Sequence, residues 1–316
     1  MSDNFLNITG DFDGAEAAGM SWAGHNTFAR LPILQETTGV DIAILGIAYD
    51  LGTTNRPGAR FGPRAIREQS SLTAEFGRMW PWDYSVFDTH ACRDAGDVAF
   101  PPGSTDVMLD AVGKRAQTLI QQGVRLVGLG GDHLVSYPLI KAHAAKYGPI
   151  SLVHFDAHSD TWENPASAPM HHGMMFLQAA REGLIDPATS IQMGMRTPNV
   201  SHGFDVVYAP EFHTTTAQRT INRIRERVGD RPVYVTVDID ALDPAYAPAT
   251  GTPVPGGLST WQLREVLIGL IGLNIVGADC VEVAPHYEGP GQITAVAAAT
   301  IAHDLMYLVA PKRVGS

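Results

Sequence analysis

The chain has 316 residues, of which 45% are hydrophobic and 17% are charged, and its formal net charge at pH 7 is −11. This composition suits a globular protein with a large buried core. The acidic charge argues against a nucleic-acid-binding protein, whose phosphate-contacting surface is usually basic, and it is compatible with a small cationic substrate.

No secretory or membrane-spanning segment is expected. Residues 1–10 lack a basic stretch followed by an apolar one, so we expect a cytoplasmic protein. The most apolar long stretch, residues 293–310, is interrupted by His303 and Asp304 and predicts a buried helix. Because nothing suggests export, the two cysteines, Cys92 and Cys280, are expected to be reduced and structural.

In chain order, an irregular segment of about 40 residues comes first and is predicted to wrap the surface or an oligomer interface. Apolar runs then predict strands at residues 41–47, 125–129, 150–155, 190–195, 233–237 and 275–283. Amphipathic stretches predict helices at residues 107–122, 135–146, 216–228 and 260–273. This alternation indicates an α/β fold with a parallel sheet covered on both faces. No repeat or linker divides the chain, so we expect one domain over residues 1–316.

Three of the predicted strands are followed by metal-ligand residue types. Residues 130–133 (GGDH), 156–160 (DAHSD) and 238–240 (DID) come directly after these strands. In parallel sheets, ligands bind just past the carboxyl ends of the strands. Residues two apart in extended chain point the same way, so these side chains can converge. Four carboxylates and two imidazoles result, from His133, Asp156, His158, Asp160, Asp238 and Asp240.

Such a group of carboxylates needs compensating positive charge. An isolated aspartate at a strand end is usually a cap, and a DxD pair is frequent by chance, but three such segments together favour a metal site. Two divalent cations would balance four carboxylates and leave room for a bridging hydroxide. Oxygen-rich ligands without thiolate fit manganese, with zinc, iron or cobalt left open. His154 lies inside its strand and is interpreted as a supporting or core histidine.

The three segments, in this order, resemble those of the ureohydrolase (arginase/agmatinase) family, and the likeness runs over about residues 41–308. The resemblance implies a three-layer α/β/α sandwich with a mostly parallel central sheet, two Mn²⁺ per subunit, and a homo-oligomer that is commonly a trimer or a hexamer. It implies one metal held by His133, Asp156, Asp160 and Asp238, and a second held by Asp156, His158, Asp238 and Asp240.

Two further residues match functional positions of that family. His172, before Gly173, takes the place of a proton-transfer histidine, although the neighbouring His171 could serve instead. Glu282 matches a glutamate that grips the guanidinium group, whereas by itself it would be interpreted as a strand-end residue in a salt bridge. The implied reaction is attack of the metal-bridging hydroxide on a guanidino carbon, with release of urea.

The loop at residues 161–171 is predicted to select the substrate. It is unlike the arginase version and is similar to bacterial agmatinases, with Asn164 as a substrate-binding residue. The prediction is therefore hydrolysis of agmatine to putrescine and urea. The alternatives are a 4-guanidinobutyrase or 3-guanidinopropionase, and less so an arginase. Glu163 would favour an amine tail, whereas Arg78 or Arg181 would favour a carboxylate.

Two other classes compete with this prediction. A deacetylase of the histone-deacetylase type shares the broad fold but would use one zinc and a pair of catalytic histidines. A non-catalytic binding protein on the same scaffold would be expected to lack a ligand or the guanidinium carboxylate. The presence of all six ligand candidates, with His172 and Glu282, argues against both classes.

Overall fold

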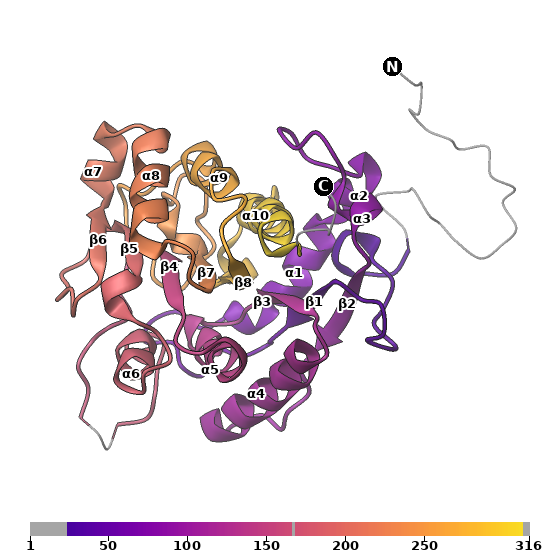
Figure 1. Cartoon of the computed structure of the whole chain (residues 1–316), viewed down its shortest axis with the longest axis horizontal. Coiled ribbons are helices and arrows are strands. Elements are labelled where there is room, and N and C mark those ends of the chain that lie inside the picture. The colour runs from indigo at the N-terminus through magenta and orange to yellow at the C-terminus, as the bar shows by residue number, and fades with distance from the viewer. Residues whose placement is uncertain (1–23, 166–167, 312–316) are drawn as a thin grey trace, which may run out of the picture.

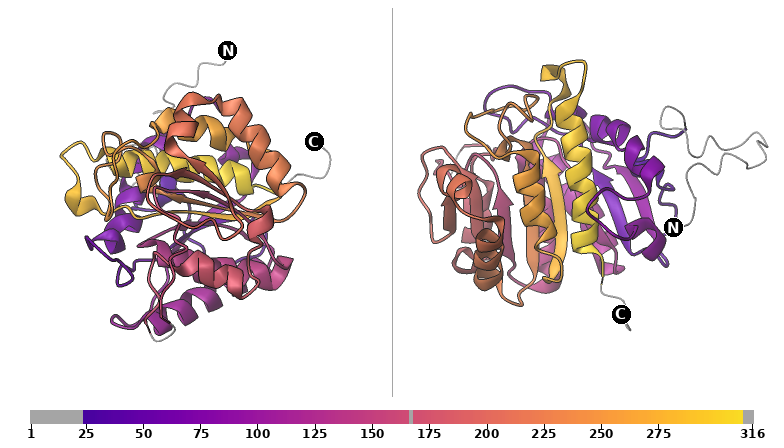
Figure 2. Two further views of the ribbon diagram at one scale, coloured as in Figure 1. Left: turned by 90° about the vertical axis from the view of Figure 1, so that its left-hand side faces the viewer. Right: turned by 90° about the horizontal axis from the view of Figure 1, so that it is seen from above.

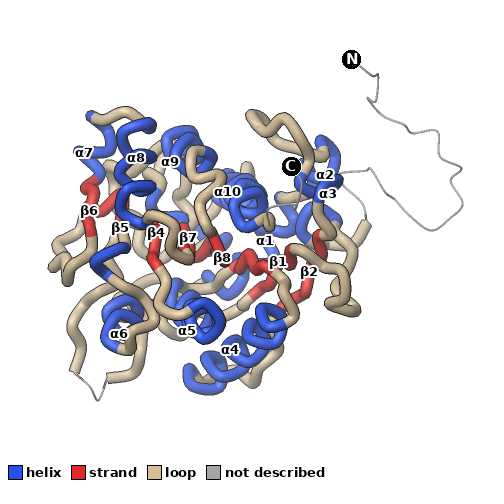
Figure 3. The backbone as a smooth tube through the Cα atoms, in the orientation of Figure 1, coloured by secondary structure: helices blue, strands red, loops and turns tan. Residues whose placement is uncertain are grey.

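Eight strands form one sheet through the centre of the molecule (Figures 1 and 3). The computed structural model describes residues 24–165 and 168–311. The strand order is β2-β1-β3-β8-β7-β4-β5-β6, and each neighbouring pair is parallel. The strands are β1 (Ile42–Gly46), β2 (Cys92–Asp97), β3 (Arg125–Leu129), β4 (Ser151–Phe155), β5 (Ile191–Met195), β6 (Asp205–Tyr208), β7 (Val233–Asp238) and β8 (Ile275–Val281).

Helices cover both faces of this sheet (Figures 1 and 2). In Figure 1, α4, α5 and α6 lie below the sheet, and α7, α8, α9, α10 and α1 lie above it. The helices are α1 (Gly62–Gln69), α2 (Ser71–Phe76), α3 (Val86–Thr89), α4 (Thr105–Gln121), α5 (Ser136–Tyr147), α6 (Met175–Arg181), α7 (Ala209–Thr214), α8 (Ala217–Val228), α9 (Thr260–Ile268) and α10 (Ile293–Val309). The predicted three-layer α/β/α fold with a parallel central sheet is confirmed.

Two hydrophobic cores, one on each face, hold the layers together. In β1, Ile42 and Ile44 belong to the core under α10, whereas Ala43 and Leu45 belong to the core over α4 and α5. Because successive side chains of a strand point to opposite faces, a strand covered on both sides is apolar throughout. Helix α10 packs against β8, α1 and α9 and is buried almost all round, which explains why its sequence is so apolar.

The six predicted strands and five predicted helices, including the buried helix at residues 293–310, are present, and most of their ends shift by only one or two residues. The helix predicted at residues 260–273 ends at Ile268, before a turn in which Gly272 has φ +91°. The edge strands β2 and β6 were not predicted. β2 is interrupted by polar residues, and β6 has only four residues, so neither forms a long apolar run.

The N-terminal prediction is covered only in part. Of the segment predicted to be irregular, residues 24–40 contain the short 3-10 helix η1 (Phe28–Arg30), and residues 1–23 lie outside the described residues. Across residues 24–165 and 168–311, no helix is both long enough and apolar enough to cross a membrane. Cys92 and Cys280 are buried and do not form a disulfide.

Candidate metal centre and active site

The predicted site residues lie at the carboxyl ends of four neighbouring strands. β3 and β4 are consecutive among the strands, yet β8 and β7 lie between them in the sheet. Because all four strands are parallel, the segments that follow them meet at one edge. His133 follows β3, Asp156 follows β4, Asp238 ends β7, and Glu282 follows β8.

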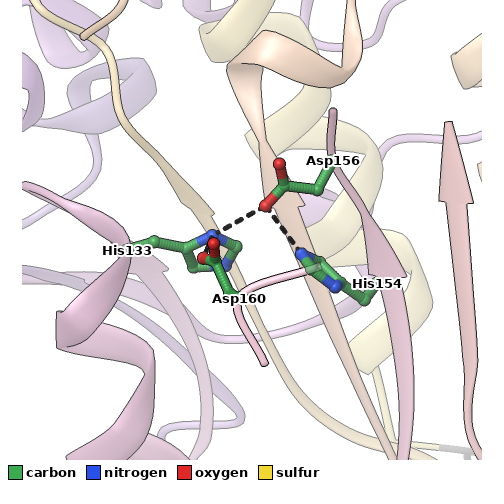
Figure 4. Close-up of side chains that lie close together, drawn as sticks. All are labelled: His133, His154, Asp156 and Asp160. Carbon is green, nitrogen blue, oxygen red and sulfur yellow. Dashed lines mark hydrogen bonds and ion pairs between the residues drawn. The ribbon is translucent and has the colours of Figure 1, made fainter. Parts of the chain in front are cut away.

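Three carboxylates surround one ring nitrogen of His133, two of which appear in Figure 4. Nδ1 of His133 lies 3.1 Å from an oxygen of Asp156, 3.1 Å from an oxygen of Asp160 and 3.3 Å from an oxygen of Asp238. All four residues are buried. Within the described part of the chain, this nitrogen has no hydrogen-bond partner. The structure thus brings together the four residues predicted to hold the first metal.

A second group forms around His158. Its Nδ1 lies 3.3 Å from Oδ1 of Asp156 and 3.1 Å from Oδ2 of Asp240. Asp156 therefore presents Oδ2 to the first group and Oδ1 to the second, as a bridging ligand would. Asp238 turns Oδ2 to the first group, while its Oδ1 accepts a hydrogen bond from the backbone N–H of Asp240 at 2.8 Å.

The charges in this cluster call for a cation. Burial raises the pKa of Asp238 well above its usual range, and the charges of Asp240 and Asp156 raise it further. Burial lowers the pKa of His133, but the surrounding carboxylates outweigh burial and raise it well above its ordinary value. Donor atoms around one divalent ion lie about 3 Å apart, since metal–ligand bonds are about 2.0–2.2 Å. The spacing and the unpartnered Nδ1 of His133 therefore fit a divalent cation.

The far side of the His133 ring is held by residues that the sequence analysis missed. Nε2 lies 2.8 Å from Oγ1 of Thr236, whose hydroxyl donates to Asp279 at 2.5 Å. Ser136 and Tyr234 also donate to Asp279, at 2.6 and 2.8 Å. Because the Thr236 proton is used on Asp279, its oxygen must accept the Nε2–H of His133, which leaves Nδ1 unprotonated for a metal. An acid inside the apolar strand β8 was the signal that could have identified Asp279.

His154 contacts a ligand candidate from behind (Figure 4). Its Nε2 lies 2.7 Å from Oδ2 of Asp156, and the side-chain amide of Gln192 donates to its Nδ1 at 3.1 Å. Since Nδ1 accepts, Nε2 carries the proton and donates to Asp156. This contact orients the Asp156 carboxylate and agrees with the supporting role predicted for His154.

Glu282 is buried at the edge of the cluster with only one oxygen engaged. Oε1 accepts a hydrogen bond from the backbone N–H of His133 at 2.8 Å and lies 2.7 Å from Nδ1 of His172. Oε2 has no hydrogen-bond partner among the residues described. Gly251 lies beside this oxygen, because a Cβ built on it would be 3.6 Å from Oε2 and 2.9 Å from the carbonyl oxygen of Arg56. Glu282 and Asp160 both have left-handed backbone, with φ +66° and +51°.

His172, not His171, faces Glu282. Nδ1 of His171 instead accepts a hydrogen bond from the backbone N–H of Gly173 at 3.1 Å. Burial lowers the pKa of His172, but the charge of Glu282 outweighs burial and raises it to about 9. The other ring nitrogen of His172 lies 2.8 Å from the hydroxyl of Thr54. Sequence analysis did not predict this contact, because the two residues are 118 positions apart.

The residues considered for the substrate tail are not brought into either metal group. The amide of Asn164 donates to the sulfur of Met174 at 3.6 Å. Glu163 and Arg181 form an exposed ion pair with each other at 2.7 Å, so their charges largely cancel. Arg78 is hydrogen-bonded to a backbone carbonyl in its own segment, five residues away. Residues 166–167 of the predicted tail-reading loop lie outside the described residues.

Comparison with known proteins agrees with this geometry. The model of the Arginase family matches residues 40–308. An agmatinase of Chromobacterium violaceum is 46% identical over 296 residues, which cover 93% of this chain and 91% of that protein. The crystal structure of a hypothetical agmatinase from Burkholderia thailandensis is 46% identical, covers 92% of both chains and superposes with a TM-score of 0.89.

A second similar structure is that of an enzyme named for a different substrate. The proclavaminate amidino hydrolase of Streptomyces clavuligerus is 40% identical, with a TM-score of 0.87 and coverage of 92% of this chain and 99% of that one. The match to the family model covers most of the chain, and the relatives are similar over almost their full length. The protein is therefore a member of the Arginase family.

Proposed function

We propose that this protein is a ureohydrolase that uses two Mn²⁺ ions per subunit to hydrolyse agmatine to putrescine and urea. The observation that carries the proposal is the buried carboxylate of Glu282, whose Oε2 has no partner among the described residues and lies beside the metal-ligand candidates. A buried acceptor without a partner is costly, and at the edge of a metal-ligand cluster a substrate donor would satisfy it.

A guanidinium group suits this acceptor. It is planar, carries a positive charge near neutral pH and presents N–H donors in a fork that matches a carboxylate. Oε1 of Glu282 is already engaged by His133 and His172, so Oε2 is the oxygen that remains for the substrate. The contact would fix the orientation of the guanidino carbon beside the metal cluster.

The residues that would hold the first ion are His133, Asp156, Asp160 and Asp238, and those for the second are Asp156, His158, Asp238 and Asp240. When bound, such ions supply a water molecule that is ionised near neutral pH. The oxygen-rich donor set without cysteine supports manganese. The supporting contacts of His154 and Thr236 keep the ligand atoms turned inward.

His172 would move the proton that the reaction requires. The reaction adds water to a guanidinium and yields urea and an alkylammonium, so the nitrogen that leaves must gain a proton. Nδ1 of His172 lies 2.7 Å from Glu282 and hence next to the proposed guanidinium position. A histidine at this position can deliver the proton to the departing amine. We also expect a trimer or hexamer, as the family resemblance implies.

The similar proteins supply the assignment of the substrate tail. Agmatine is supported by the agmatinase names of the relatives, whereas the similar fold of a proclavaminate amidino hydrolase indicates that this scaffold also serves other amidino substrates. The Glu163–Arg181 pair offers no net charge to either an amine or a carboxylate tail. 4-Guanidinobutyrate and 3-guanidinopropionate are therefore the alternative substrates, and arginine is a less favoured one.

The test is urea release by the manganese-loaded protein, run in parallel on agmatine, 4-guanidinobutyrate, 3-guanidinopropionate and arginine. We expect agmatine to give the highest kcat/KM. A higher value for a carboxylate-tailed compound would overturn the tail assignment alone. No urea from any of the four compounds would overturn the proposed reaction. Metal content, expected at two ions per subunit, separates this site from a one-zinc deacetylase.

A further inference from the structure

Both ring nitrogens of His172 are engaged, from opposite sides of the ring. Nδ1 faces Oε1 of Glu282 at 2.7 Å. Nε2 faces two groups of one residue, the hydroxyl of Thr54 at 2.8 Å and the backbone N–H of Thr54 at 3.1 Å. A backbone N–H can only donate, so the neutral imidazole must offer a lone pair at Nε2 and carry its proton on Nδ1, toward Glu282.

The Thr54 hydroxyl has a different capacity. A hydroxyl donates one hydrogen bond and accepts up to two. When His172 is protonated, Nε2–H needs an acceptor, and the backbone N–H of Thr54 cannot provide one. The hydroxyl can accept this proton in the charged state and donate in the neutral state, without a change of position. Thr54 is thus a partner for both protonation states of His172.

Thr54 also links a buried group to the surface. His172 is only 6% exposed, whereas Thr54 is exposed. The loop that carries Thr54 is fixed on both sides: the carbonyl of Gly52 accepts from the His172 N–H at 3.1 Å, and Asn55 donates to the carbonyl of Gly251 at 2.9 Å. The Thr54 hydroxyl is therefore held between the imidazole of His172 and the solvent.

We propose that Thr54 is a positioning residue that passes protons between Nε2 of His172 and water, an inference that rests on the proposed ureohydrolase reaction. In one transfer, the Nε2–H bond breaks and Oγ of Thr54 gains that proton while its own hydroxyl proton goes to a water molecule. The reverse transfer reloads His172. The hydroxyl is regenerated each time, and no oxidation or reduction is involved. A proton that leaves His172 from Nδ1, on the Glu282 side, can thus be replaced at Nε2 from water.

The test compares Thr54→Val with Thr54→Ser in the manganese-loaded full chain, by urea release from agmatine across pH. Both variants keep the backbone N–H, and only Thr54→Val loses the hydroxyl. We expect Thr54→Val to lower kcat about 10-fold with KM changed less than about 2-fold, a smaller loss than that of a general acid or base itself. The limb of the kcat profile that reports His172 should move to lower pH, because the charged ring loses its acceptor. Thr54→Ser should retain most of the activity.

Two controls separate this role from a structural one. Thr118→Val makes the same change on the exposed face of α4, where the hydroxyl donates to the carbonyl of Lys114 in the same helix, and should leave kcat unchanged. In a His172→Asn background, Thr54→Val should cause no further decrease in kcat, because a residue that acts through His172 has no effect on the reaction when His172 is absent. A further loss there, or equal losses in the Val and Ser variants, would overturn the inference.

The outcomes also separate this inference from the function on which it rests. If the wild-type protein releases urea and Thr54→Val has the same kcat and pH profile, only the role of Thr54 is overturned. If the wild-type protein releases urea from none of the four guanidino compounds, the proposed reaction fails, and the role of Thr54 fails with it.

Discussion

Removal of one hydroxyl behind the metal cluster should weaken metal binding. In Thr236→Val, the shape of the side chain is kept, but Nε2–H of His133 loses its acceptor at 2.8 Å and Asp279 loses one of three hydroxyl donors. Loss of a contact that orients a metal ligand typically lowers affinity by about 10- to 100-fold, or about 1.4–2.7 kcal/mol. The group left unsatisfied in the interior costs a further 1–3 kcal/mol of stability, roughly.

The assay is competition for Mn²⁺ against a chelator, with metal content measured on the same samples, so it does not depend on turnover. Thr189→Val is the matched control. It also removes a buried hydroxyl, which pairs with Ser151 at 2.8 Å at the amino end of the sheet, away from the metal cluster. We expect the control to lose stability but not metal affinity. Wild-type affinity in Thr236→Val would refute the argument that this hydroxyl sets the His133 tautomer.

Three further predictions concern other buried charges. Glu282→Gln should lower kcat/KM about 10- to 150-fold in the urea assay, the equivalent of a charge-assisted hydrogen bond of about 1.5–3 kcal/mol; an unchanged value would exclude the proposed guanidinium contact. Arg264→Met should lower the free energy of unfolding by about 3 kcal/mol, measured with denaturant, because it leaves the buried Asp304 carboxylate without its cation, while metal content should not change. Burial and the nearby Arg264 lower the pKa of His303 to about 3, so the unfolded chain binds that proton more readily and stability falls as pH drops from about 6.5. Between pH 7 and pH 5, the free energy of unfolding of His303→Leu should fall by about 2 kcal/mol less than that of the wild type, as measured with denaturant at each pH. Equal decreases in the two proteins would contradict this prediction.

The sequence was most informative where one local rule decides the outcome. Apolar runs such as residues 125–129 become central strands because burial on both faces requires apolar side chains throughout. The six ligand candidates were found because parallel strands bring their carboxyl ends to one edge, and the metal-ligand residue types follow those ends directly. The structure brings these residues together, although their role as ligands stays a prediction.

Contacts between segments that are distant in the chain could not be predicted from the sequence by such local rules. Thr54 meets His172 only because the loop after β1 folds over the edge of the sheet, and no spacing rule connects them. The position of Glu282 depends on a backbone turn that ends β8, which periodicity does not reveal. Glu163 and Arg181 were considered separately for the substrate tail, but they neutralise each other, because α6 carries Arg181 to the loop.

The left-handed backbone at Glu282 and Asp160 has a consequence for substitution at these two positions. Side chains other than glycine cost roughly 1–2 kcal/mol in that conformation, whereas glycine adopts it freely. Glycine at position 282 would remove this strain, but it would also leave the backbone N–H of His133 and Nδ1 of His172 without the carboxylate that they contact. The same turns place a carboxylate beside His133 at both positions, which glycine could not supply, so the strained backbone and the site chemistry are tied to the same two residues.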